Sequence, residues 1–171
     1  GSLKLIAALV FGVVGTAANG QGVPSETEAQ KIRPDSLQPG DRLGRVSIDG
    51  NWLVVSTPLH DLTGGAWLYR WNGSLWMLHQ KLHDLQPPLD DDDEFGYAVD
   101  IHGDLIAVGA PGDDDGDVNS GATYLFRIVN SSVVLEAKLP GAVSEDEYRS
   151  GSSVALSDDT VVSGSPWANV D

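Results

Sequence analysis

The chain has 171 residues, of which 41% are hydrophobic, and this content excludes a disordered tail. Twenty-five acidic and ten basic residues give a formal charge of −15, which disfavours nucleic acid and anionic lipid as partners because like charges repel. Cysteine is absent, which excludes disulfides, thiolate nucleophiles and cysteine-based zinc sites.

Residues 1–20 have the pattern of an export signal. Lys4 precedes an apolar run over residues 5–14, and small residues follow it, which is the order found in signal peptides. The run is shorter than the about 20 apolar residues that span a bilayer, so we expect no stable membrane span. An N-terminal anchor and a buried helix are the alternatives. We therefore expect an exported protein, in an extracellular, periplasmic or cell-surface location.

Residues 21–40 are polar, contain three prolines and show no apolar period, which predicts a linker.

Three similar stretches make up much of the remaining chain. They are residues 43–58, 95–111 and 150–166, and they close on Pro58, Pro111 and Pro166 at intervals of 53 and 55 residues. The pair Lys81-Leu82 also returns as Lys138-Leu139. Such a period indicates a repeat array, and propeller blades have about 40–50 residues each. We divide residues 41–171 into units over 41–89, 90–143 and 144–171, the last one truncated, which makes about two and a half repeats.

Each unit predicts four short antiparallel strands. In the second unit they are expected at residues 98–101, 105–109, 122–129 and 133–139, where β-branched and aromatic residues are frequent. The turns Asp49-Gly50 and Asn72-Gly73 in the first unit suit tight hairpins, which need a positive φ. The predicted fold class is all-β, with antiparallel four-stranded blades of a β-propeller. A β-solenoid is the alternative.

The second unit carries Phe95-Gly96 and Gly109-Ala110-Pro111, the FG…GAP signature. The chain therefore resembles the FG-GAP repeats of integrin α-chain N-terminal propellers, and more closely those of exported bacterial and algal proteins. The longer pattern of those proteins is present as Gly103-Asp104, Asp113-Asp114-Asp115, Ser120-Gly121, Tyr124, Phe126 and Lys138-Leu139.

The resemblance implies a seven-bladed propeller in the complete protein. The chain is then a fragment, which we favour, a truncated product, or a subunit that associates with the missing blades of the same protein. We expect Phe95 to be a core aromatic residue between blades. Gly96 and Gly109 are expected where backbones approach closely or bend, and Pro111 is expected at the end of a strand.

The resemblance also implies structural calcium, although the integrin-type loop is absent because residues 101–105 leave no room for it. A different acidic loop follows the GAP motif. In it, Asp113, Asp115, Asp117 and Asn119 alternate as oxygen ligands of the kind that calcium prefers. The loop fits no EF-hand register, so a solvated acidic turn is the alternative. A second acidic run, over residues 90–94, is predicted to be a solvated loop.

The chain contains no G-x-S-x-G, H-E-x-x-H, P-loop or G-x-G-x-x-G motif, and we predict that it is not an enzyme. Its four histidines, at positions 60, 79, 83 and 102, are expected at the surface or in turns. The predicted function is that of an exported, non-catalytic repeat module that binds a protein or glycan in adhesion. The alternative is a purely architectural part of a larger exported protein or enzyme.

Two kinds of surface residue are singled out by the pattern. Trp167 follows a GAP-like proline and is the candidate binding residue, whereas Trp67, Trp71 and Trp76 are expected to pack within blades. Asn72 and Asn130 begin N-glycosylation sequons on predicted hairpin turns.

Overall fold

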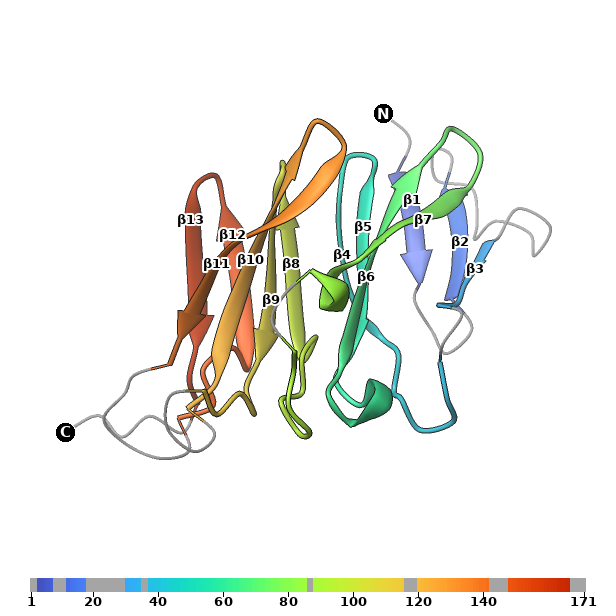
Figure 1. Cartoon of the computed structure of the whole chain (residues 1–171). Coiled ribbons are helices and arrows are strands. Elements are labelled where there is room, and N and C mark those ends of the chain that lie inside the picture. The colour runs from blue at the N-terminus through green and yellow to red at the C-terminus, as the bar shows by residue number, and fades with distance from the viewer. Residues whose placement is uncertain are drawn as a thin grey trace.

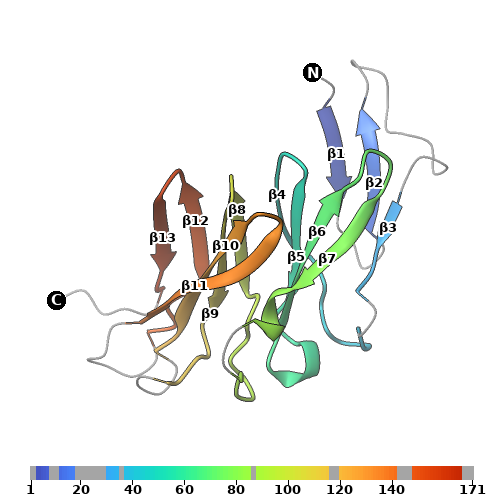
Figure 2. The same cartoon turned by 45° about the horizontal axis from the view of Figure 1, so that its top comes forward.

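The computed structural model describes residues 3–7, 12–17, 30–34, 37–85, 88–115, 120–141 and 148–166. Within these ranges the chain forms antiparallel sheets that follow one another in chain order, as both views show (Figure 1, Figure 2). The predicted all-β class with antiparallel four-stranded sheets is confirmed, and the sheets are consistent with propeller blades.

Two four-stranded sheets occupy the middle of the molecule. The first blade consists of β4 (Arg45–Asp49), β5 (Trp52–Thr57), β6 (Gly65–Trp71) and β7 (Trp76–Lys81), paired in that order. The second blade consists of β8 (Ala98–His102), β9 (Leu105–Ala110), β10 (Ala122–Val129) and β11 (Ser132–Pro140). Short 3₁₀ turns, η2 (His60–Leu62) and η3 (Leu82–Asp84), lie in the first unit.

Two smaller sheets flank the blades. The C-terminal hairpin pairs β12 (Ser153–Ser157) with β13 (Thr160–Gly164). The N-terminal sheet has the order β1 (Leu3–Ala7), β2 (Gly12–Ala17) and β3 (Gln30–Ile32). Figure 1 shows these two sheets at opposite ends of the row.

The two blades share one apolar core. Val54 and Leu68 of the first blade pack with Phe95, Val108 and Phe126 of the second unit, among other residues. Phe95 is 0% exposed, and its ring lies 5.3 Å from that of Tyr124. The prediction that Phe95 is a core aromatic residue between blades is confirmed.

Strand β9 is buried along its whole length because both of its faces are covered. Its residues Ile106 and Val108 face the core shared with the first blade, whereas Leu105 and Ala107 pack against Val154 and other residues of the C-terminal hairpin. A strand covered on both faces has no solvent side to make polar, which explains the uninterrupted apolar run over residues 105–110.

The first strands of successive units, β4, β8 and β12, are joined by side-chain hydrogen bonds. The Ser47 hydroxyl donates to Asp100 Oδ1 at 2.7 Å, and the Leu156 N–H donates to Asp100 Oδ2 at 2.7 Å. Asp49 Oδ2 accepts the Gly103 N–H at 2.6 Å. Asp100 thus fixes the position of β8 between its two neighbours.

Part of the predicted linker over residues 21–40 is corrected by the structure. Residues 30–32 form β3, and both Ile32 and Pro34 are buried. The Gln30 carboxamide holds this segment in place, since it donates to Trp76 O at 2.7 Å and accepts the Trp76 N–H at 2.6 Å. Ile32 then packs with Leu53 and Trp67 on the face of the first blade opposite the second.

The predicted export segment, residues 1–20, contains β1 and β2, which pair with each other. A role for this segment in export stays a prediction. Within the part of the chain that the structure describes, we find no helix with the length and apolar character needed to cross a membrane.

Candidate functional site

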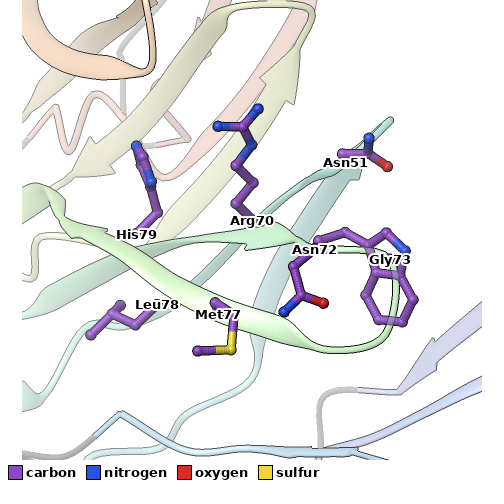
Figure 3. A pocket seen from close by; sticks show the side chains of 8 residues that line it. Asn51, Arg70, Asn72, Gly73, Met77, Leu78 and His79 are labelled. Atoms are coloured by element: carbon purple, nitrogen blue, oxygen red, sulfur yellow. The ribbon is translucent and has the colours of Figure 1, made fainter.

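A pocket of about 560 Å³ lies at the β6–β7 hairpin of the first blade (Figure 3). The residues that line it include Asn51, Arg70, Trp71, Asn72, Met77 and His79. In Figure 3, the Arg70 and His79 side chains extend from one side of the hairpin, and the Met77 and Leu78 side chains extend from the other. The hairpin therefore presents a polar side and an apolar side.

The turn sequence explains the local geometry of this pocket. Asn72 Oδ1 accepts the N–H groups of Ser74 at 2.9 Å and Leu75 at 2.8 Å, and Gly73 has a φ of 103°. An asparagine that bonds the backbone two and three residues ahead, followed by a glycine with positive φ, stabilises a tight connection. The connection places Trp71 and Trp76 side by side, with ring centroids 5.4 Å apart.

The two tryptophans of this pair differ in exposure. Trp76 is buried, whereas Trp71 is half-buried. Trp67 and Trp76 pack within the first blade as predicted, but Trp71 keeps part of its indole ring at the pocket.

The polar side of the pocket is held by the second blade. The Arg70 guanidinium lies 5.1 Å from the Trp52 ring centroid and donates to Ser131 Oγ at 3.2 Å. His79 Nε2 donates to Ser131 O at 2.8 Å, and its ring lies edge-on to Trp52. These contacts orient the Arg70 and His79 side chains before any ligand binds.

A second group of polar residues lies at the loop end of the first unit. His60 Nδ1 lies 3.0 Å from Asp41 Oδ2, and both residues are buried. The Trp67 ring lies 5.2 Å from the His60 ring and 5.1 Å from the His83 ring. Burial lowers the pKa of His83, which favours its neutral form. His60 and His83 lie in turns, as expected, with His60 buried and His83 half-buried.

The matching place in the second unit holds carboxylates and a lysine. Asp113 is only 2% exposed, and its Oδ2 accepts the Tyr124 hydroxyl at 2.7 Å and lies 2.7 Å from Lys138 Nζ. Lys138 Nζ also lies 2.5 Å from Asp115 Oδ2. Burial and the nearby charge of Asp113 raise the pKa of Asp93 to about 6. This cluster links the acidic loop to strands β10 and β11.

The described part of the predicted calcium loop does not fit calcium well. Asp113 and Asp115 both bind the Lys138 ammonium, whereas Asp117 and Asn119 lie outside the described residues. Across the described ranges, no group of three or more histidines and acids is placed to hold a metal ion. Calcium prefers six to eight oxygen ligands, and the Lys138 ammonium competes with it for the Asp113 and Asp115 oxygens. Calcium binding stays a prediction.

The other predicted site residues have different outcomes. Trp167 lies outside the described residues. Asn72 and Asn130 lie in exposed hairpin turns, as expected, and their glycosylation stays a prediction.

The sequence reasoning missed the contact between Asp41 and His60. Alignment of the first two units places Asp41 on Asp93 and His60 on Asp113. Polar residues that differ at equivalent positions of the two repeats are the sequence signal that could have pointed to this contact. The sequence reasoning also missed the pocket beside Trp71, which is lined by residues of the first unit, two of which, Arg70 and His79, contact Ser131 of the second.

Comparison with protein families matches residues 76–126 to the FG-GAP repeat. The matched segment begins at β7, ends within β10, and includes both the Phe95-Gly96 and the Gly109-Ala110-Pro111 motifs. No curated protein matches the chain.

Proposed function

We propose, from the premise that this chain contains an FG-GAP repeat at residues 76–126, that it is an exported, non-catalytic module that binds a glycan. The β6–β7 hairpin of the first blade is the proposed contact site. The sequence of residues 1–20 supports export, and the pocket beside Trp71 supports binding.

The half-buried indole of Trp71 is the observation that carries the proposal. A tryptophan that keeps an apolar ring face at a pocket can stack on the face of a sugar ring. The carboxamides of Asn51 and Asn72 lie around the same pocket and can exchange hydrogen bonds with hydroxyl groups. Because the chain has a formal charge of −15, a neutral glycan is favoured over an acidic one.

The arrangement of the histidines supports a non-catalytic role. His60 pairs with Asp41, His83 contacts the Ala66 backbone, and His79 contacts Ser131. These imidazoles hold secondary structure and neighbouring strands together, which is a structural use of groups that can otherwise transfer protons.

The test uses the full chain and a panel of neutral oligosaccharides in isothermal titration calorimetry. Trp71→Ala is expected to weaken binding about tenfold or more, because stacking contacts of an aromatic anchor contribute on that scale. Val134→Ala, an exposed residue of β11 outside the pocket, is the matched control and is expected to bind like the wild type. Equal affinities of Trp71→Ala and the wild type would exclude this site.

A purely architectural role is the second candidate. It is supported by Arg70 and His79, because both pocket residues already contact Ser131 of the next blade. Absence of wild-type binding to every neutral glycan and to candidate protein partners would favour this alternative.

A further inference from the structure

The ammonium group of Lys138 lies at the centre of the acidic cluster in the second unit. Lys138 on β11 is directly opposite Tyr124 on β10 in the strand register, and its Nζ lies 5.2 Å from the tyrosine ring centroid. From there it reaches both Asp113 and Asp115, at 2.7 and 2.5 Å. A single side chain of the outer strand thus holds two carboxylates of the loop that follows the GAP motif.

The buried position of Asp113 requires such a partner. A buried carboxylate is strongly destabilised unless an opposite charge and hydrogen bonds compensate for its lost hydration. Asp90, Asp113 and Asp114 each raise the pKa of Asp93, which shows that negative charge is concentrated around this cluster. Burial lowers the pKa of Lys138, but its hydrogen bonds to Asp113 and Asp115 outweigh this and raise the pKa overall. The side chain therefore stays charged.

We infer that Lys138 replaces a bound cation in the second blade: its ammonium joins Asp113 and Asp115 to β11, so these two carboxylates need no calcium. The ammonium provides the positive charge and the hydrogen-bond donors that the two carboxylates require. Since it is covalently attached to β11, it also fixes the loop to the sheet without depending on the concentration of a free ion.

The first blade provides a natural comparison. Lys81 has the same place in the register, opposite Trp67, but His60 stands where the second unit has Asp113. His60 and Leu62 thus stand in place of Asp113 and Asp115 near Lys81, and the acid of this loop, Asp61, is exposed and lies 3.3 Å from His60 Nε2. A lysine at this register position acts as a cation substitute only where the loop supplies carboxylates.

The experiment compares the thermal unfolding of the full-length wild type, Lys138→Met and Lys81→Met. Each protein is measured in chelator and in calcium at matched ionic strength, which removes differences in general screening. The unfolding midpoint of the wild type is expected to be unchanged by calcium, and so is that of Lys81→Met. Lys138→Met is expected to unfold about 5 °C or more below the wild type in chelator, because Asp113 loses its counter-charge.

Calcium is then expected to raise the midpoint of Lys138→Met, because binding to the native state stabilises it by mass action. Calorimetric titration should show calcium binding to Lys138→Met that is absent in the wild type. If Lys138→Met is unfolded in chelator, folding on addition of calcium is the same positive result.

Three results would overturn the inference. One is a wild-type midpoint that rises with calcium and loses that rise in Asp115→Asn. Another is a Lys138→Met midpoint equal to that of the wild type in chelator. The third is a destabilised Lys138→Met that calcium neither stabilises nor folds.

Discussion

At the scale of single residues, the turns before the two blades share a backbone geometry but have differently charged side chains beside them. Asp41 accepts the N–H of Gln38 at 2.8 Å, and Asp93 accepts the N–H of Asp90 at 2.9 Å, so both aspartates close the same four-residue turn. In the first unit the neighbouring imidazole of His60 contacts Asp41. In the second unit, the acid Asp113 takes the place of that imidazole, and Asp93 is left beside another carboxylate.

Because of this neighbouring carboxylate, we expect Asp93 to make the stability of the folded protein depend on pH. Its pKa is raised from 3.8 to about 6, so the folded state holds a proton that the unfolded state releases between these values. Asp93 thus favours the native state at acidic pH, and this contribution is lost as the pH rises through about 6. Above that pH a buried negative charge remains in the folded protein.

Asp93→Asn is therefore expected to stabilise the chain by about 1–3 kcal/mol near pH 8, with a gain that shrinks towards pH 4. Asparagine retains an acceptor oxygen for the Asp90 N–H. Urea unfolding across this pH range measures the difference in unfolding free energy between the wild type and Asp93→Asn. His83, whose lowered pKa makes its own contribution rise with pH, is present in both proteins and cancels in this difference. A difference that is constant with pH would contradict the assignment.

At the scale of elements, successive units meet through very close backbone contacts. Gly96 has a φ of 89°, and a Cβ at this position would lie 2.6 Å from Gly65 O of β6. Gly109 of β9 is similarly close to Gly151 at the start of the next unit. The predicted close approach at Gly96 and Gly109 is confirmed, and it accounts for glycine at both places in the FG…GAP signature.

Gly96→Ala is expected to destabilise the chain by about 2 kcal/mol or more, because it adds both a clash between units and left-handed strain. Gly44 is the equivalent glycine of the first unit, and a Cβ there would meet no atom within 4 Å. Gly44→Ala is therefore the matched control, with an expected change of about 0.5 kcal/mol or less. Similar losses of unfolding free energy for the two variants would exclude a special packing role for Gly96.

Elements whose pattern is local were predictable from the sequence. The strand expected at residues 122–129 is β10, because its apolar residues and the flanking Gly121 and Asn130 mark it without reference to the rest of the fold. Phe95 could be assigned to the core because it belongs to the FG…GAP signature, which resembles a known repeat.

Elements that depend on distant partners were not predictable in this way. The segment 30–34 is polar in sequence, yet Gln30 places it through two hydrogen bonds to Trp76, 46 residues away. The Asp41–His60 contact joins two loops that are 19 residues apart in the sequence, and the Trp71 pocket forms where the β4–β5 turn meets the β6–β7 hairpin, so both depend on non-local contacts. Trp167, Asp117 and Asn119 lie outside the described residues, so their predicted roles remain to be tested.

At the scale of the whole molecule, stability depends on packing between sheets. The first blade buries one face against β3 and the other against the second blade, and β9 is covered on both faces. Apolar residues removed from water at these faces provide the main driving force for the arrangement. Because residues of both blades form the same core, neither blade is expected to unfold alone.

The most direct test of this shared core monitors one blade while the other is weakened. The described tryptophans Trp52, Trp67, Trp71 and Trp76 all belong to the first blade, so a Trp167→Phe background makes tryptophan fluorescence report on that blade. Far-ultraviolet circular dichroism reports on all sheets together. Phe126→Leu weakens the second blade by removing ring atoms from a side chain that is 0% exposed.

Introduced into the Trp167→Phe background, Phe126→Leu is expected to lower the fluorescence and circular dichroism midpoints together, by a common free energy of about 1–3 kcal/mol. Coincident transitions would show that the two blades unfold as one cooperative unit. A fluorescence midpoint that stays unchanged while the circular dichroism transition shifts or splits would contradict a core shared between the blades.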